Sequence, residues 1–170
     1  MSPDLSISEA ERRQYAEHLS RMLVFEGLDK DFILEVAYRC RLEGAEPGDV
    51  LMAEGEKGVD VFFLVDGLAG VQIESIAPHF EVGITRLGPG AAIGEMSLID
   101  GVERSASVVA IERCVLLRTT IADIEAVTRI HPIQGMRLYR NMAAVLARRL
   151  RTMNRKVTAM MRARLRRGSE

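Results

Sequence analysis

The sequence is poor in the residues that build disulfide scaffolds and metal sites. Among its 170 residues are two cysteines, Cys40 and Cys114, three widely separated histidines and no tryptophan. Two cysteines are too few for a disulfide framework, they are not spaced as metal ligands, and each lies in an apolar setting. We therefore expect two buried free thiols and no bound metal.

Long hydrophobic runs and the signatures of common enzymes are also lacking. No apolar run approaches the ~20 residues of a membrane-spanning helix, and the N-terminus lacks the basic-then-apolar pattern of a signal peptide. No Gly-Lys-Ser/Thr phosphate loop and no Ser-His-Asp arrangement is visible. With 48% hydrophobic and 28% charged residues, the chain is expected to be a soluble, cytoplasmic, non-enzymatic protein without a membrane span.

Charge is present in quantity but is unevenly divided. The net charge of -1 hides 11 basic residues against one acidic residue in residues 137–170, which leaves 12 basic and 23 acidic residues in residues 1–136. A basic tail of this kind could touch nucleic acid non-specifically. Solvated arginines flanking a coiled coil are the interpretation that we favour.

Hydrophobic periodicity predicts helices first and then short strands. Ser8 and Glu11 form a possible capping box for a helix over residues 6–24, and Asp29 or Asp31 begins a second, short helix through Ala37. Between residues 44 and 119 the period changes to two, which favours a sandwich or jelly roll. The strands are expected at residues 50–52, 61–65, 68–76, 82–87, 107–111 and 114–117. Glycines between them, at positions 55, 58, 67, 88 and 90, are expected to have positive φ.

The last part of the chain predicts two helices. Thr120 caps the first, His131-Pro132 interrupts the pattern, and a long helix then runs to about Arg167. Apolar residues recur at spacings of three and four, as in a coiled coil; they are Ala143, Leu146, Leu150, Met153, Val157 and Met160. Roughly 34 residues give ~50 Å of helix, which a body with a radius of gyration near ~14 Å cannot cover. We therefore expect a homodimer formed through this helix.

The most informative stretch of the chain is residues 94–108, GEMSLIDGVERSASV. Gly94 and Glu95 open a short helical turn, whose start presents free N–H groups. Arg104 adds a planar fork of donors that matches two phosphate oxygens. Glu95 adds an acceptor suited to a sugar hydroxyl rather than to a phosphate. The combination indicates a nucleotide.

This stretch resembles the phosphate-binding cassette of cyclic nucleotide-binding domains, the family found in bacterial cAMP receptor proteins and in protein kinase A regulatory subunits. The resemblance covers most of the chain and includes further motifs, namely PGDV at 47–50, EGEKG at 54–58, DG at 66–67, LGPG at 87–90 and ARRL at 147–150. It implies a mainly β fold, an eight-stranded β-roll flanked by helices, with a long C-terminal helix. We expect an N-terminal helical segment (1–24), the β-roll (25–130) and a dimerisation helix with a basic tail (131–170).

The resemblance also implies the roles of single residues. Arg104, Ser105, Ala106 and Gly94 would hold the phosphate, and Glu95 would accept a hydrogen bond from the ribose 2′-OH. Four residues would contact the base: Val71, Ile84, Met153 and Asn154. The expected ligand is cAMP. The Ser105 hydroxyl leaves cGMP open, because cGMP-preferring relatives use a hydroxyl there to hold a guanine edge.

The chain differs from the receptor proteins after the long helix. They continue into a winged helix-turn-helix, whereas only Gly168-Ser169-Glu170 follows here, so we expect no sequence-specific DNA binding. The sequence predicts a sensor that signals through its C-terminal helix to an unknown effector protein. Two alternatives remain open: an interaction module that keeps the β-roll but binds no nucleotide, and a regulatory fragment of a larger transcription factor or channel.

Overall fold

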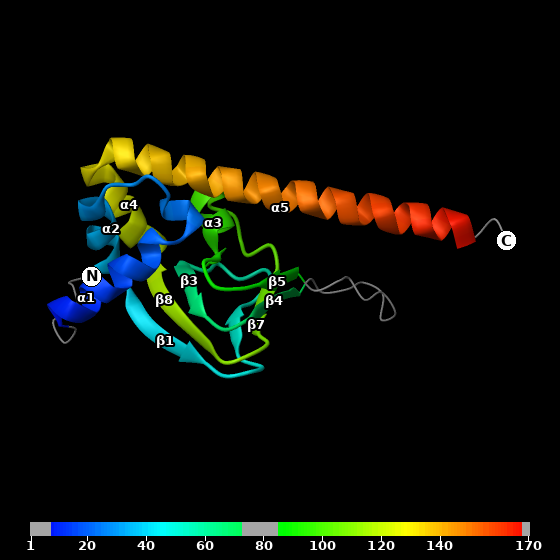
Figure 1. Cartoon of the computed structure of the whole chain (residues 1–170), viewed down its shortest axis with the longest axis horizontal. Coiled ribbons are helices and arrows are strands. Elements are labelled where there is room, and N and C mark those ends of the chain that lie inside the picture. Colours follow the sequence, from blue (N-terminus) through cyan, green and yellow to red (C-terminus); the bar gives the residue numbers. More distant parts are fainter. Residues whose placement is uncertain (1–7, 73–84, 168–170) are drawn as a thin grey trace.

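Two four-stranded antiparallel sheets form a roll in the computed structural model, which describes residues 8–72 and 85–167 (Figure 1). One sheet has the order β1-β8-β3-β6 and the other the order β2-β7-β4-β5. The strands are β1 (Arg41–Ala45), β2 (Val50–Met52), β3 (Asp60–Asp66), β4 (Ala69–Gln72), β5 (Thr85–Leu87), β6 (Ala92–Ile93), β7 (Ser107–Ala110) and β8 (Cys114–Thr120).

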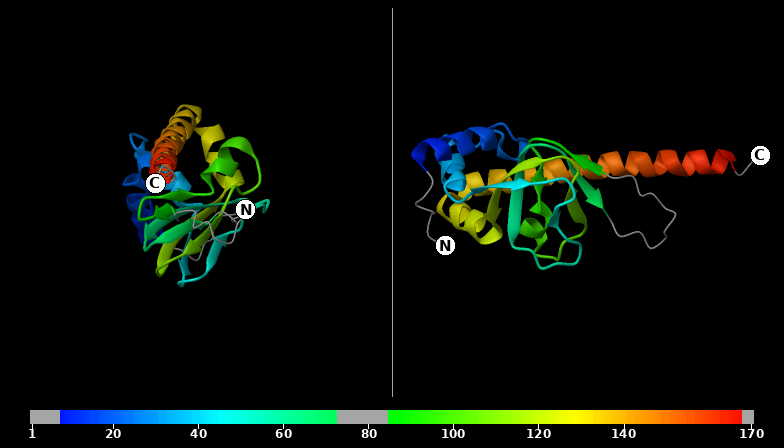
Figure 2. Two further views of the ribbon diagram at one scale, coloured as in Figure 1. Left: turned by 90° about the vertical axis from the view of Figure 1, so that its right-hand side faces the viewer. Right: turned by 90° about the horizontal axis from the view of Figure 1, so that it is seen from below.

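Helices cover one end of the roll and one runs along it (Figures 1 and 2). The helical elements are α1 (Glu9–Ser20), η1 (Leu23–Phe25), α2 (Lys30–Ala37), α3 (Glu95–Asp100), α4 (Ile121–Ile130) and α5 (Pro132–Arg167). The β-roll with flanking helices and a long C-terminal helix is thus confirmed. Within the described residues, no helix combines the length and the apolar character needed to cross a bilayer.

Strand β3 joins two hydrophobic cores because both of its faces are buried. Phe62 and Leu64 point into the roll, where they pack between the two sheets. Val61 and Phe63 point to the other side, against the helices. Phe25 of η1 meets Phe63 edge to face, with ring centroids 5.2 Å apart. The period-two alternation of β3 therefore fixes the helices against the roll.

Only the first part of α5 packs into the hydrophobic core. Leu138 and Met142 are fully buried in the core that β3 shares with the helices. Asn141 donates from Nδ2 to the carbonyl oxygens of Val24 (3.1 Å) and Glu26 (2.9 Å). The 36 residues of α5 span about 54 Å at 1.5 Å per residue, and the distal part projects beyond the roll (Figure 2).

The helix boundaries confirm several sequence-based expectations. The capping box of Ser8 and Glu11 is formed, although α1 is shorter than the predicted 6–24 helix. Thr120 accepts from the Asp123 amide at the start of α4. The break at His131-Pro132 separates α4 from α5. Asp29 occupies the N-cap of α2, but its side chain makes no capping hydrogen bond.

The strand expectations agree less completely with the structure. β4 covers Ala69–Gln72 and β5 covers Thr85–Leu87, so Leu68 precedes the strand, and the expected strand residues between 73 and 84 lie outside the described residues. β1 and β6 were not predicted as strands. Positive φ is observed at Gly55, Gly67 and Gly90 but not at Gly58 or Gly88. The turn interpretation of those last two glycines was therefore wrong.

Candidate functional site

A cavity of about 1150 Å³ lies between the roll, the α3 region and α5. Its volume is slightly above the usual range of about 300–1,000 Å³ for small-molecule sites. Met52, Val71 and Val108 line it from the sheet that contains β2, β4 and β7. Among the described residues that line it, four are cationic and one, Glu95, is acidic; the cations are Arg104, Arg148, Arg149 and Lys156. The surplus of positive charge suits an anionic ligand.

Arg104 is a buried cation without a carboxylate partner among the described residues. The residue is only 4% exposed. Its guanidinium donates to two backbone carbonyl oxygens, those of Gly94 (3.1 Å) and Asp60. Its Nε has no hydrogen-bond partner in the described part of the chain. Burial lowers the pKa of Arg104, and nearby acidic groups offset part of this effect. A buried charge of this kind calls for a bound anion.

Two glycines make room for the Arg104 guanidinium. A Cβ added at Gly58 would lie 2.2 Å from its Nε and 2.5 Å from an Nη. A Cβ at Gly94 would lie 2.6 Å from the other Nη and 2.7 Å from the Asp60 carbonyl oxygen. This glycine also has a φ of +83°, which disfavours other residues. Gly58 is therefore required for space rather than for backbone conformation. The contact of Gly94 with a phosphate stays a prediction.

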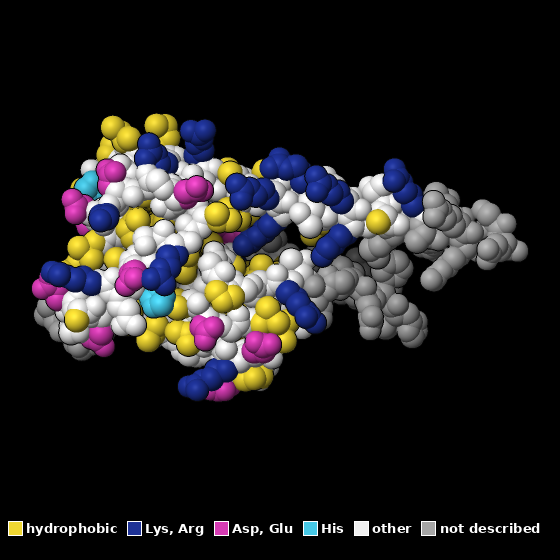
Figure 3. All heavy atoms as spheres, viewed as in Figure 1, with side chains coloured by type: hydrophobic (Ala, Val, Ile, Leu, Met, Phe, Trp, Pro, Cys, Tyr) yellow, Lys and Arg dark blue, Asp and Glu magenta, His cyan; other side chains and the backbone are white. Residues whose placement is uncertain are grey.

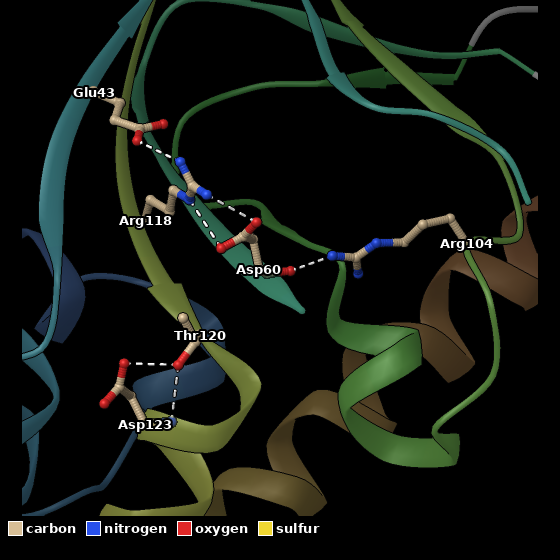
Figure 4. A network of polar contacts seen from close by, with 6 residues as sticks. All are labelled: Glu43, Asp60, Arg104, Arg118, Thr120 and Asp123. Carbon is tan, nitrogen blue, oxygen red and sulfur yellow. Dashed lines mark hydrogen bonds and ion pairs between the residues drawn. The ribbon is translucent and has the colours of Figure 1, made fainter. Parts of the chain in front are cut away.

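Asp60 connects Arg104 to a second arginine on the neighbouring strand (Figure 4). Its carboxylate receives two hydrogen bonds from Arg118 of β8, at 2.9 Å from Nε and 3.0 Å from Nη2. Arg118 also donates to Glu43 of β1 at 2.8 Å. These carboxylates raise the pKa of Arg118. Because the Asp60 carboxylate is occupied by Arg118, only the Asp60 backbone carbonyl reaches Arg104, which keeps the positive charge of Arg104 unneutralised.

Glu95, at the start of α3, is paired with the long helix. The residue is 3% exposed. One Nη of Arg149 donates to its carboxylate, and the other Nη donates to the Ala92 carbonyl oxygen at 3.1 Å. Burial raises the pKa of Glu95, and the Arg149 charge is the largest of the effects that oppose this. The candidate sugar-binding carboxylate is therefore held by a side chain of α5.

The remaining predicted phosphate residues lie on the same wall of the cavity. Ser105 and Ala106 follow Arg104 and both line the cavity. The Ser105 hydroxyl is directed at the Met96 thioether, at 3.4 Å. A thioether is a weak acceptor, so a phosphate oxygen would compete well for this hydroxyl.

The structure brings together only some of the predicted base-contacting residues. Val71 and Met153 line the cavity from opposite sides, from β4 and α5. Ile84 lies outside the described residues. Asn154 is exposed and is absent from the residues that line the cavity in the single chain. The contact of Asn154 with the base stays a prediction.

Three residues important for the geometry were not identified from the sequence. Arg149, Asp60 and Gly58 act on residues that are 54, 44 and 46 positions away in the chain, respectively. The sequence could have indicated Arg149, because it lies one helical turn before Met153 and therefore on the same face of α5. The described residues contain no group of three or more His, Cys, Asp or Glu side chains arranged to hold a metal ion.

Comparison with known proteins identifies the family. Residues 43–131 match the family model described as cyclic nucleotide-binding domain, which is slightly more than half of the chain. The solved structure of a cyclic nucleotide-binding domain from Methylobacillus flagellatus KT has the same fold. Its TM-score is 0.73 at 22% identity, and the match covers 88% of this chain and 84% of that one.

Curated relatives are longer proteins. The chain is 31% identical to Glutaminase 2 of Bradyrhizobium diazoefficiens over 140 residues, which are 82% of this chain and 22% of the relative. It is 36% identical to the cyclic AMP receptor protein of Thermus thermophilus over 107 residues, 61% of this chain and 46% of the receptor. The chain thus spans between about a fifth and a half of these relatives.

Proposed function

This chain belongs to the cyclic nucleotide-binding domain family, and from that premise we propose that it is a regulatory module whose ligand is cAMP. The phosphate lies against Arg104, with Ser105, Ala106 and Gly94 around it. The ligand state is passed to a partner protein through α5. Similarity to a receptor named for cyclic AMP supports the choice of nucleotide.

The observation that carries this proposal is the state of Arg104. A buried guanidinium that contacts only carbonyl oxygens, and whose Nε is unpartnered among the described residues, is an incomplete ion pair. A cyclic phosphodiester supplies one negative charge and two free oxygens, which complete that pair. The presence of Arg104 and Glu95 in the same cavity also argues against the alternative of a module that binds no nucleotide.

Glu95 supports recognition of the sugar. Its carboxylate oxygens accept the ribose 2′-OH, and a deoxyribose would leave part of this buried acceptor unsatisfied. The 2′-OH and Arg149 then act on the same carboxylate. Nucleotide binding therefore alters the contact that holds α5 to α3, which gives a direct route from the ligand to the helix.

The base would lie between the sheet and α5. Val71 and Met153 supply apolar surface on the two sides, and Ile84 and Asn154 remain proposed contacts. Met153 offers no hydrogen bond that would select one purine edge. Selection for adenine therefore depends on the fit of the base to apolar surface and on the Asn154 amide.

Dimerisation through α5 is part of the proposal. Several apolar side chains on one side of the distal helix are unusually exposed in the single chain: Leu150 (59%), Met153 (49%), Val157 (44%) and Met161 (64%). Leu150, Met153 and Val157 belong to the predicted coiled-coil seam. The side chain of Met160, the last predicted member, lies outside the described part of the structure, and Met161, four residues after Val157, continues the same side of the helix. A second copy of α5 would cover them.

Displacement of a fluorescent cAMP analogue by unlabelled nucleotides tests the choice of ligand. We expect cAMP to displace it at a lower concentration than cGMP, and a cyclic dinucleotide to displace it poorly. Displacement by cGMP at equal or lower concentration would overturn the preference for cAMP. If neither the analogue nor any of the nucleotides binds, the chain is an interaction module instead.

A further inference from the structure

Helix α5 carries a row of positive charge with no negative charge in its own sequence. Its 36 residues include 11 lysines and arginines and no aspartate or glutamate. The rest of the 170-residue chain then has 12 basic and 24 acidic residues. No i,i+4 ion pair can form within the helix, because such a pair needs a carboxylate. Figure 3 shows dark blue side chains following the helix beyond the roll.

Four of these arginines share one side of the helix, and we call them the arginine face: Arg148, Arg151, Arg155 and Arg162. At about 100° per residue they fall within an arc of roughly 60°, opposite the seam formed by Leu150, Met153, Val157 and Met161. All four are exposed. Arg148 also lines the cavity at its edge of the row, whereas Arg151, Arg155 and Arg162 do not.

Three of the four arginines, Arg151, Arg155 and Arg162, are therefore clear of the cavity, and a dimer formed through the seam would leave them exposed. None of the four arginines forms an ion pair with another described residue. Neighbouring positive charges at spacings of three and four residues repel one another and weaken the helix. Such a row gains stability when a partner supplies negative charge at matching intervals.

We propose that the arginine face binds an acidic helical segment of a partner protein. Carboxylates at matching positions along one side of a helix would face Arg148, Arg151, Arg155 and Arg162, and the planar fork of each arginine accommodates a carboxylate in two-point contact. This proposal gives the chemistry of the effector and rests on the proposed function only for the role of α5 as the output element.

Two other polyanions fit the surroundings of the arginine face less well. The row of arginines is about 21 Å long, and duplex DNA would extend past it. The rest of the chain has an excess of 12 acidic residues, which would repel the DNA. A membrane-binding helix needs apolar side chains beside its cations, and the apolar seam lies on the opposite side. A short acidic helix can stay within the row.

The test uses a designed 21-residue helical peptide with four glutamates on one face, separated by three, four and seven residues to match the four arginines. A control peptide has the same composition with the glutamates distributed around the helix. We expect the full-length protein to bind the first peptide at least tenfold more tightly in fluorescence anisotropy, with affinity falling as salt is added. Equal binding of the two peptides contradicts the proposal.

Two triple variants distinguish binding at the arginine face from an effect of the net charge of the protein. The triple variant Arg151→Gln, Arg155→Gln and Arg162→Gln should lose at least tenfold in peptide affinity. The matched control, Arg13→Gln, Arg21→Gln and Arg113→Gln, removes the same charge from exposed positions elsewhere and should bind as the wild type does. An unaffected triple variant overturns the proposal, as does tighter binding of a 24-base-pair duplex DNA or of vesicles that contain phosphatidylglycerol.

Nucleotide binding is measured on the same proteins. The triple variant should retain wild-type cAMP affinity, since none of its three residues lines the cavity. Absence of cAMP binding by the wild type would reject the proposed function while leaving the peptide result interpretable. Loss of peptide binding in both triple variants would assign the interaction to net charge and reject the arginine face.

Discussion

Arg149, in the middle of α5, donates a hydrogen bond to the buried carboxylate of Glu95 at the start of α3. The side chain of Glu95 is 4% exposed and that of Arg149 is 33% exposed, so the pair lies at the edge of the cavity, between the roll and the long helix. The acid proposed to recognise the ribose is thus also a contact that holds α5 to the roll outside the hydrophobic core. Any ligand that hydrogen-bonds to Glu95 acts on α5 as well.

The pH dependence of cAMP binding follows from Glu95. Burial raises the pKa of this carboxyl above its ordinary value of 4.5. As the pH falls through the raised pKa, the carboxylate becomes protonated and its acceptor capacity for the ribose decreases. We expect cAMP affinity to fall in mildly acidic buffer, before ordinary carboxylates titrate, when it is measured by calorimetry at a series of pH values.

Glu95→Gln provides the control for that titration. It should bind cAMP more weakly than the wild type at neutral pH and lose most of the acid dependence. The pKa of Glu95 is raised on folding, so protonation of Glu95 stabilises the folded state. A loss of cAMP affinity in acid is therefore not explained by unfolding caused by protonation of Glu95. An acid dependence in Glu95→Gln as steep as that of the wild type would assign it to another group.

Arg149→Met should move the acid transition to higher pH. The Arg149 charge lowers the pKa of Glu95 and opposes the effect of burial, which raises it. Without that charge the pKa of Glu95 rises further, and Glu95 becomes protonated at a higher pH. The measurement is the midpoint of cAMP affinity against pH. Arg151→Met, a neighbouring exposed position that does not line the cavity, should keep the wild-type midpoint. A wild-type midpoint in Arg149→Met would show that the pair does not influence the site.

Gly58→Ala should weaken cAMP binding by about tenfold or more. The new Cβ would lie 2.2 Å from the Arg104 Nε, so the guanidinium must move away from its place in the cavity. A tenfold loss of affinity corresponds to about 1.4 kcal/mol, which is a modest cost for displacing a charge-assisted hydrogen bond to the phosphate. The control is Gly88→Ala, where no atom lies within 4 Å of the added Cβ and φ is not positive. Equal affinities of the two variants would contradict the spatial role of Gly58.

Dimerisation depends on the exposed apolar seam. The double variant Leu150→Asp and Val157→Asp should be monomeric at tens of micromolar in light scattering, where we expect the wild type to be a dimer. Each large apolar side chain buried contributes about 1.5–3 kcal/mol. Ile130→Asp and Ile133→Asp change two equally apolar exposed residues (61% and 71%) off the seam, and this variant should stay dimeric. A monomeric wild type would remove the proposed dimer.

The helix caps and the buried strand β3 could be predicted from the residues that form them. Strand β3 is a continuous apolar run from Val61 to Val65 because both of its faces meet a core, and the caps at Ser8 and Thr120 are formed by residues three positions apart. β1 was missed because four of its five residues are at least partly exposed, and β6 because it has only two residues. Neither strand leaves a hydrophobic pattern of its own.

The contacts that complete the candidate site join residues distant in the sequence. Gly58 was interpreted as a turn residue, and its requirement comes from a side chain 46 positions later. Arg149 was recognised as part of a helix motif, but periodicity along α5 does not indicate which residue of α3 it meets. The resemblance to a family identified Arg104 and Glu95, whereas only the three-dimensional arrangement gave Asp60 and Arg149 as their neighbours.

Titration of Arg104 variants with cAMP tests the central claim most directly. Breaking a buried charge pair costs ~3–5 kcal/mol, which is roughly two to three decades in affinity, so calorimetry should give that loss for Arg104→Ala. Arg104→Lys should fall between this variant and the wild type, because it keeps the charge without the planar fork. The control Arg113→Ala, a surface arginine paired with Glu46, should bind normally. If Arg104→Ala binds cAMP within threefold of the wild type, the buried guanidinium is not the phosphate anchor and the account is wrong.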